Sequence, residues 1–152
     1  MPYDPNSNYT EEKRFPELLR IGFIIVSVSL LFVSCFYICY CTIHGCTKSI
    51  DVLLFGWLGL FGGGANLTWT ANPLLIITWI LFSKRHRLSL FFSILATLIS
   101  LSFLGFNQIQ EGESGGSTAI IKIGPGYWFW FSSCLTTFLG NLTLIIYKFR
   151  HS

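Results

Sequence analysis

The chain has 152 residues, of which 52% are hydrophobic and only 11% are charged. Soluble domains carry about a quarter of charged residues, so this composition excludes an ordinary water-soluble globule. The ten basic and seven acidic residues are also clustered, and they leave uncharged stretches at 21–47, 52–83, 88–110 and 123–147. Each stretch can cross a hydrocarbon core about 30 Å thick as a helix, which predicts a polytopic membrane protein.

We expect residues 1–20 to form a cytoplasmic N-terminal segment and residues 21–40 to form the first span. The apolar run is too long for the hydrophobic part of a signal peptide, and no small-residue cleavage site follows it. The segment from Phe32 to Cys35 loosely resembles a lipid-attachment box. Because the residues after Cys35 stay apolar, an uncleaved span is the better interpretation.

The second uncharged stretch is interrupted by glycines. Its first part, 53–61, covers only about 14 Å at helical rise and is predicted to be a short interfacial helix. Its second part, 65–82, is just long enough to span, and Pro73 removes a helical hydrogen bond near its middle, which predicts a kink. A flexible break with nearby amides is also a candidate ligand site. The candidate hinge or ligand residues are Gly62, Gly63, Gly64, Asn66, Asn72 and Pro73.

The third and fourth spans are predicted at 88–106 and 125–147, and small or hydroxyl residues recur in both at steps of three and four. Such stripes let helices approach closely in lipid, whereas the alternative is the lining of a solute path. No ionisable residue accompanies the hydroxyls, which favours packing. The stripes are Ser89, Ser93, Ala96, Thr97 and Ser100 in the third span, and Ser132, Thr136, Gly140 and Thr143 in the fourth.

Two segments connect the spans on the side opposite to the termini. The first, 41–52, is short. The second, 107–124, contains the acidic sequence GESGGS, and its flanks NQIQ and STAIIKIG predict a small β-hairpin. The predicted fold is therefore an all-α membrane protein, a four-transmembrane-helix bundle with a broken second segment, a small extracytoplasmic hairpin-like loop and a cytoplasmic tail at 148–152.

The basic residues predict the orientation. Eight of the ten lie on the side of the termini, and only Lys48 and Lys122 lie on the other. The positive-inside rule then places both termini in the cytoplasm, with the chain in the inner (plasma) membrane. The lipid bilayer is thus the first predicted partner. Because the charges are divided among short segments, they do not form the broad basic surface of a nucleic-acid-binding protein.

Cys41 and Cys46 fall in the first outer segment, where an oxidising compartment favours a disulfide across four intervening residues. Two alternatives remain open. Together with His44, the cysteines offer three metal ligands without a fourth. They also resemble the cysteines just after span one in the four-span disulfide-generating quinone reductases of bacterial inner membranes. This chain departs from those enzymes because it has no close C-x-x-C, no second cysteine pair in its second loop and no evident quinone-binding arginine.

Catalytic groups are missing from the predicted spans, which contain no Asp, Glu, Lys, Arg or His. The three histidines, His44, His86 and His151, lie at membrane edges or beyond. A haem clamped by two axial histidines and a nucleophile–base pair are therefore unavailable within the membrane. We predict no enzymatic activity, no cofactor and no bound metal.

Three short motifs stand out: GWLG from Gly56, ANPLL from Ala71 and GPGYW from Gly124. Together they resemble a pattern found in small, uncharacterised bacterial inner-membrane proteins with four spans. The resemblance covers most of the chain. It implies the four-span topology and transfers no activity.

The function predicted from the sequence is that of a non-enzymatic multi-pass membrane protein. It would act by helix packing with itself or with a membrane partner, as an accessory or immunity-like subunit. The alternative is a homo-oligomeric permease or channel for a neutral small solute. A third interpretation, membrane thiol oxidoreductase, depends on Cys41 and Cys46.

Overall fold

The computed structural model describes residues 5–82, 85–110 and 116–150, with side chains from residue 15 onward. The remaining segments, 1–4, 83–84, 111–115 and 151–152, lie outside the described residues. They include parts of the predicted N-terminal segment, of the acidic GESGGS sequence and of the cytoplasmic tail.

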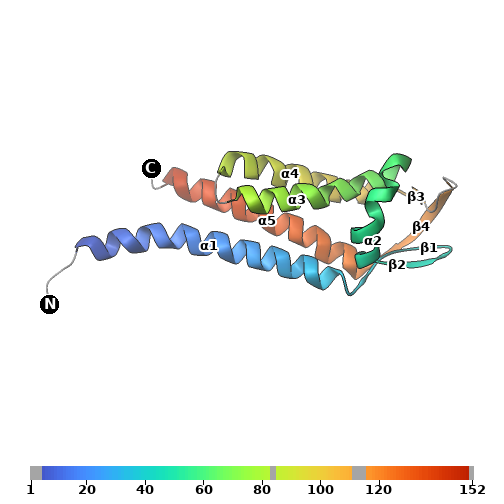
Figure 1. The fold of residues 1–152 in the computed structure, drawn as a ribbon, viewed down its shortest axis with the longest axis horizontal. Helices are drawn as coiled ribbons and strands as arrows, with labels where there is room; N and C mark the ends of the chain where they lie inside the picture. The colour runs from blue at the N-terminus through green and yellow to red at the C-terminus, as the bar shows by residue number, and fades with distance from the viewer. Residues whose placement is uncertain (1–4, 83–84, 111–115, 151–152) are drawn as a thin grey trace.

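Four helices run lengthwise side by side, with a small sheet at one end of the molecule and both chain ends at the other (Figure 1). The helix α1 packs against α5, α3 packs against α4, and α4 also packs against α5. These helices are α1 (Pro5–Ser34), α3 (Ala71–Leu81), α4 (His86–Ser102) and α5 (Pro125–Arg150).

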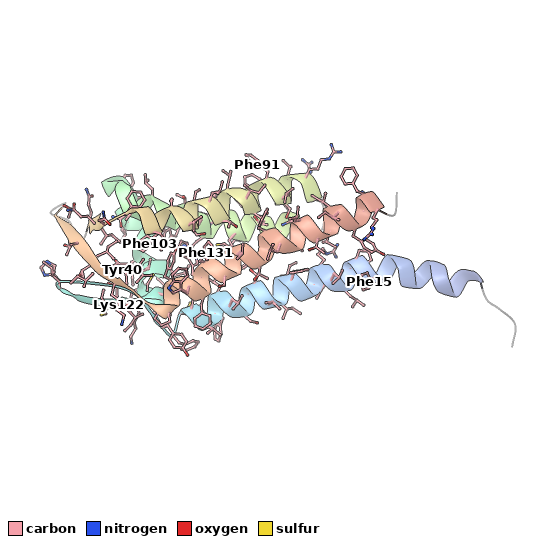
Figure 2. The ribbon with its side chains drawn as sticks, turned by 180° about the vertical axis from the view of Figure 1, so that it is seen from behind. Phe15, Tyr40, Phe91, Phe103, Lys122 and Phe131 are labelled. Atoms are coloured by element: carbon pink, nitrogen blue, oxygen red, sulfur yellow. A yellow bond between two sulfur atoms is a disulfide. The ribbon has the colours of Figure 1, made fainter. Side chains whose placement is uncertain are left out.

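Three helical segments among the described residues are long and apolar enough to cross a membrane: Phe15–Ser34, His86–Gly105 and Pro125–Arg150. Large apolar side chains also point outward from the helices, as Phe91 of α4 does in Figure 2. A bilayer interior accommodates such side chains, whereas water does not. The predicted helical fold, with helices long and apolar enough to cross a membrane, is confirmed for these three segments.

The first helix ends earlier than predicted. α1 ends at Ser34, and a turn follows in which the Tyr37 amide donates to the Ser34 carbonyl oxygen at 3.0 Å. Residues Ile38–Thr42 then form the strand β1. The predicted helix to Tyr40 was therefore wrong at its end, because an apolar run rich in aromatic and β-branched residues is compatible with either a helix or a buried strand.

The interrupted second stretch is helical over most of its length but not regular. α2 (Ser49–Phe55) begins earlier than the predicted interfacial helix at 53–61 and continues as the 3₁₀ helix η1 (Gly56–Gly62). A second 3₁₀ helix, η2 (Gly64–Thr70), leads into α3. Pro73 is the third residue of α3, where a missing N–H is tolerated, so the expected mid-helix kink at Pro73 was wrong.

The two connecting segments form one four-stranded sheet with the order β2-β1-β4-β3. All its pairings are antiparallel. The pairing of β3 with β4 confirms the predicted hairpin. The pairing of β1 with β4 was not predicted, and it joins the first connecting segment to the second. The other strands are β2 (Gly45–Lys48), β3 (Gln108–Gln110) and β4 (Ser117–Ile123).

Small residues line the buried faces of α4 and α5. On α4, four of the five predicted stripe residues, all except Thr97, are fully buried. On α5 the predicted stripe was wrong by about one position, since Thr143 is exposed and only Gly140 of the predicted set is buried. Adjacent small residues such as Ser132 and Ser133 make the buried face of α5 hard to distinguish in the sequence from the neighbouring face that was predicted. The buried small and polar residues of α5 include Ser133, Cys134, Thr137, Gly140 and Asn141.

Candidate functional site

A cavity of about 820 Å³ lies at the sheet end of the bundle. Most of its lining residues come from β1, α2, η1, η2, β3 and the first turns of α5, and the rest include residues of α1 and α3. This volume falls within the range of small-molecule sites, about 300–1,000 Å³. Aromatic and aliphatic side chains make up most of its wall.

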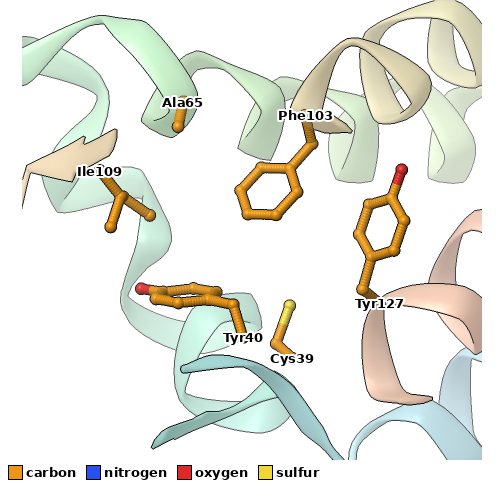
Figure 3. Close-up of a cluster of buried hydrophobic side chains, with 6 residues drawn as sticks. All are labelled: Cys39, Tyr40, Ala65, Phe103, Ile109 and Tyr127. Atoms are coloured by element: carbon orange, nitrogen blue, oxygen red, sulfur yellow. The ribbon is translucent and has the colours of Figure 1, made fainter. Parts of the chain in front are cut away.

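The inner wall consists of six buried side chains that come from five different elements and face a common space (Figure 3). Phe103, at the start of the 3₁₀ turn η3 (Phe103–Gly105), stacks on Tyr127 with ring centroids 5.3 Å apart. The Tyr127 hydroxyl donates to the Ser100 carbonyl oxygen at 3.0 Å. The six residues are Cys39, Tyr40, Ala65, Phe103, Ile109 and Tyr127.

The GPGYW motif brings the start of α5 directly against β1. The Gly124 amide donates to the Cys39 carbonyl oxygen at 2.8 Å. A Cβ atom at Gly124 would overlap the Ile38 carbonyl oxygen, and one at Gly126 would overlap Ser49 Oγ. Both glycines are therefore required by close approach, and they place Tyr127 in the cavity wall.

The GWLG motif belongs to a longer pattern in which Gly56, Gly59 and Gly62 recur every three residues. A 3₁₀ helix has three residues per turn, so the three glycines of η1 share one face. That face packs against η2 and β3, and a Cβ on any of the glycines would approach a neighbouring side chain within 3 Å. The side chains in the way are those of Trp69, Asn66 and Gln110, respectively.

Two further glycines make the turn between η1 and η2. Gly63 and Gly64 have φ values of 72° and 58°, in the left-handed region that glycine adopts without strain. The glycine run predicted as a hinge thus forms a tight turn between two 3₁₀ helices. A hinge motion at Gly62, Gly63 and Gly64 stays a prediction.

A second face of the same helical run forms the rim of the cavity. Phe55, Leu58 and Phe61 also recur every three residues, and all three line the cavity. Their side chains are nevertheless 60%, 55% and 95% exposed, respectively. The mouth of the cavity is therefore bordered by exposed apolar side chains. This rim was not predicted, although its three-residue period is visible in the sequence.

The polar groups of the cavity differ in whether they have partners. The Asn66 amide nitrogen donates to the Gln110 carbonyl oxygen at 3.2 Å, and Asn72 Oδ1 accepts from Trp130 Nε1 at 2.8 Å. The Ser49 hydroxyl, in contrast, is buried in the wall without a hydrogen-bond partner.

Charge in the cavity comes from a single residue. Asp51 is the one charged side chain among the described lining residues, and it lies two residues beyond Ser49 on α2. Lys48 and Lys122 are exposed and do not line the cavity. The Asp51 carboxylate is thus the charged group that the cavity presents to a ligand, whereas the Ser49 hydroxyl is enclosed within the wall.

Cys39 places a thiol in the inner wall. Burial raises the pKa of the Cys39 thiol from 9.0 to about 11, and the neighbouring Ser49 hydroxyl offsets part of this rise. The contact between the two side chains does not have the geometry of a hydrogen bond. Because the thiolate is the nucleophilic form, a protonated Cys39 is a poor nucleophile at neutral pH.

Cys41 and Cys46 face each other across the β1–β2 hairpin, and their sulfur atoms are bonded, with Cα atoms 4.0 Å apart. The pair does not line the cavity. His44 lies in the hairpin turn, and the described part of the chain contains no group of three His, Cys, Asp or Glu side chains placed to hold a metal ion.

Of the six residues predicted as hinge or ligand residues, the structure brings Gly62, Asn66 and Asn72 to the cavity. Gly63, Gly64 and Pro73 are not part of its lining. Comparisons of the chain with protein-family models, curated proteins and solved structures find no match. The function is therefore argued from the geometry of the site.

Proposed function

We propose that the chain is a non-enzymatic, multi-pass integral membrane protein of the accessory type, which acts by binding a membrane component at its sheet-end cavity. The observation that carries this proposal is a contrast between two regions. Apart from Asn141 Oδ1 and His86 Nδ1, the described buried polar side chains of the helices are hydrogen-bonded to one another or to backbone, whereas the cavity carries the Asp51 carboxylate and a buried, unpartnered Ser49 hydroxyl.

The polar groups at the centre of the bundle support a packing role. The Ser27 hydroxyl of α1 lies 2.8 Å from the Thr137 hydroxyl of α5. The indole of Trp79 in α3 donates to Ser27 Oγ at 3.1 Å and lies 3.3 Å from Thr137 Oγ1. Three helices are therefore joined through one cluster of hydrogen bonds. A permease needs such groups to be free for the solute, so this arrangement favours recognition over transport.

Thiol chemistry receives less support from the geometry. The Cys41–Cys46 pair lies outside the cavity, and the thiol inside it, Cys39, is held in its protonated form by burial. Within the described lining, Asp51 has no histidine or lysine beside it with which to form a proton-transfer pair.

The proposal includes four spans. The 3₁₀ helix η2 and α3 follow each other without a break, and they have seven and eleven residues. At about 2.0 and 1.5 Å per residue they extend together about 30 Å, which matches the hydrocarbon core. η2 and α3 would therefore cross the membrane as one unit between α1 and α4.

The proposal also places the chain in a bacterial inner membrane with both termini in the cytoplasm. Most basic residues belong to segments at the end of the bundle that holds the termini, whereas Lys122 lies at the sheet end (Figure 2). Positive-inside bias then puts the sheet and the cavity mouth on the outer side. Fusions at the C-terminus test this: green fluorescent protein is expected to fluoresce and alkaline phosphatase to be inactive, and the reverse would contradict the orientation.

Binding is tested by extracting the full chain with its surrounding lipid and identifying bound lipids and proteins by mass spectrometry. Leu58→Trp narrows the cavity mouth, and Leu54→Trp is the matched control, because Leu54 is 56% exposed on α2 but does not line the cavity. We expect Leu58→Trp to lose a component that the parent and Leu54→Trp retain. Identical bound components in all three chains would overturn the proposal.

A further inference from the structure

We infer that the component bound in the cavity is a membrane lipid whose head group carries an ammonium group, with one acyl chain held along η1 and the ammonium placed at Asp51. This inference rests on the proposed function and names the ligand class of the same site.

The rim indicates that the cavity opens to the bilayer. Phe55, Leu58 and Phe61 border the mouth and expose more than half of their surfaces. Exposing these apolar side chains to water costs free energy, whereas contact with hydrocarbon does not. The helical run Ser49–Gly62 that carries them is apolar but too short to span. A molecule entering through this mouth therefore comes from the lipid phase.

The aromatic wall is suited to a hydrocarbon chain because its polar atoms are already used. The Tyr127 hydroxyl is bound to the Ser100 carbonyl oxygen, the Trp130 indole to Asn72, and the Trp69 indole to the Leu53 carbonyl oxygen at 3.0 Å. These rings present only their apolar faces and edges to the cavity. Contact with an acyl chain breaks none of these hydrogen bonds, and it buries the methylene groups of the chain.

The head group is defined by charge. Asp51 supplies the only charge among the described lining residues, and it lies four residues before Phe55 on the same helical run. No described Lys, Arg or His lines the cavity to bind an anionic head group. A primary ammonium, with three N–H donors and a positive charge, complements the Asp51 carboxylate, and the aromatic faces also attract it.

The test uses the full chain, purified in detergent, stripped of lipid and mixed with equal amounts of phosphatidylethanolamine and phosphatidylglycerol with identical acyl chains. Native mass spectrometry then counts each lipid that stays bound. We expect the ammonium lipid to be preferred about tenfold, as a charge-assisted hydrogen bond implies. Asp51→Asn is expected to abolish the preference without reducing total lipid, and Asp51→Glu to keep it. Because Asp51 is exposed, these variants should fold.

The same measurement on Leu58→Trp is expected to show loss of both lipids, whereas Leu54→Trp is expected to match the parent. Equal retention of the two lipids by the parent, or an unchanged preference in Asp51→Asn, would overturn the inference but not the proposed function. If the component lost in Leu58→Trp is a protein and not a lipid, this result would likewise overturn the inference and leave the proposed function intact. A parent chain that retains nothing dependent on Leu58 would overturn both.

Discussion

Ser27 of α1 and Ser133 of α5 exchange hydrogen bonds with each other's backbone. The Ser27 hydroxyl reaches the Ser133 carbonyl oxygen at 2.9 Å, and the Ser133 hydroxyl donates to the Ser27 carbonyl oxygen at 2.8 Å. The reciprocal arrangement requires the two backbones to lie close together. Gly140 serves the same approach further along α5, where a Cβ atom would collide with the ring of Phe23. The α1–α5 interface is thus built on small residues.

The first prediction concerns this pair. Ser27→Ala and Ser133→Ala should each lower the free energy of unfolding by about 1 kcal/mol, because each removes a hydroxyl donor between helices. The free energy of unfolding of the double variant should fall by less than the sum of the two single losses, since both hydroxyls belong to one network. Unfolding in detergent micelles measures these values. Ser102→Ala, at an exposed serine bonded within its own helix, is the control, and strictly additive losses would contradict the shared network.

The second prediction concerns the glycine face of η1. Gly59→Ala should lower the free energy of unfolding by about 1–3 kcal/mol, because the new Cβ atom would lie 2.9 Å from the Asn66 amide. Gly22→Ala is the matched control: it lies in α1 with no neighbouring atom within 4 Å of the new Cβ, and alanine should stabilise the helix by up to about 1 kcal/mol. Equal effects at both sites, measured by thermal unfolding, would show that the packing of η1 on η2 is not tight.

Much of the membrane architecture could be predicted from the sequence, because lipid imposes simple rules on hydropathy. Long uncharged stretches predicted the apolar helices, and the flanks of GESGGS predicted the β3–β4 hairpin. The end of α1 could not be predicted in the same way. Residues such as Ile38 and Tyr40 are apolar in a helix and in a strand alike, and only the pairing of Ile38 with β2 and of Tyr40 with β2 and β4 distinguishes the two.

The cavity itself could be predicted only in part. Asn66 and Asn72 stood out as amides in an apolar stretch, and both line the cavity. Asp51 and Ser49 did not stand out, because they look like ordinary loop residues until β1 pairs with β4 and brings the sheet over α2. The three-residue period of Phe55, Leu58 and Phe61 was readable, but it has a meaning only once that segment is known to be a 3₁₀ helix.

The third prediction concerns the cysteines. The structure bonds Cys41 to Cys46 and leaves Cys35, Cys39 and Cys134 as free thiols. Alkylation of the denatured chain with a maleimide mass tag should therefore modify three cysteines without reductant and five after reduction. Replacing Cys41 and Cys46 together by serine should cost about 2 kcal/mol or less, since the closed loop is short. Five modified cysteines without reductant would contradict the bond.

The last prediction concerns the pH dependence of Cys39. Its thiol lies in the cavity wall, where burial disfavours the charged thiolate and raises the pKa from its ordinary value of 9.0 to about 11 in the folded chain. The raised pKa also links folding to pH. The protonated thiol favours the folded state below pH 9, and this contribution is lost as the pH rises through 11.

The measurement is the rate at which iodoacetamide modifies Cys39, followed by mass spectrometry that localises the label. Because the thiolate is the reacting form, the rate in the native chain should rise about tenfold per pH unit and continue to rise beyond pH 9. The unfolded chain is the control, and its rate should level off near pH 9.0. A native profile that also levels off there would mean that Cys39 meets water freely, and it would contradict a thiol enclosed by Tyr127 and its neighbours in the wall of a cavity that opens to lipid.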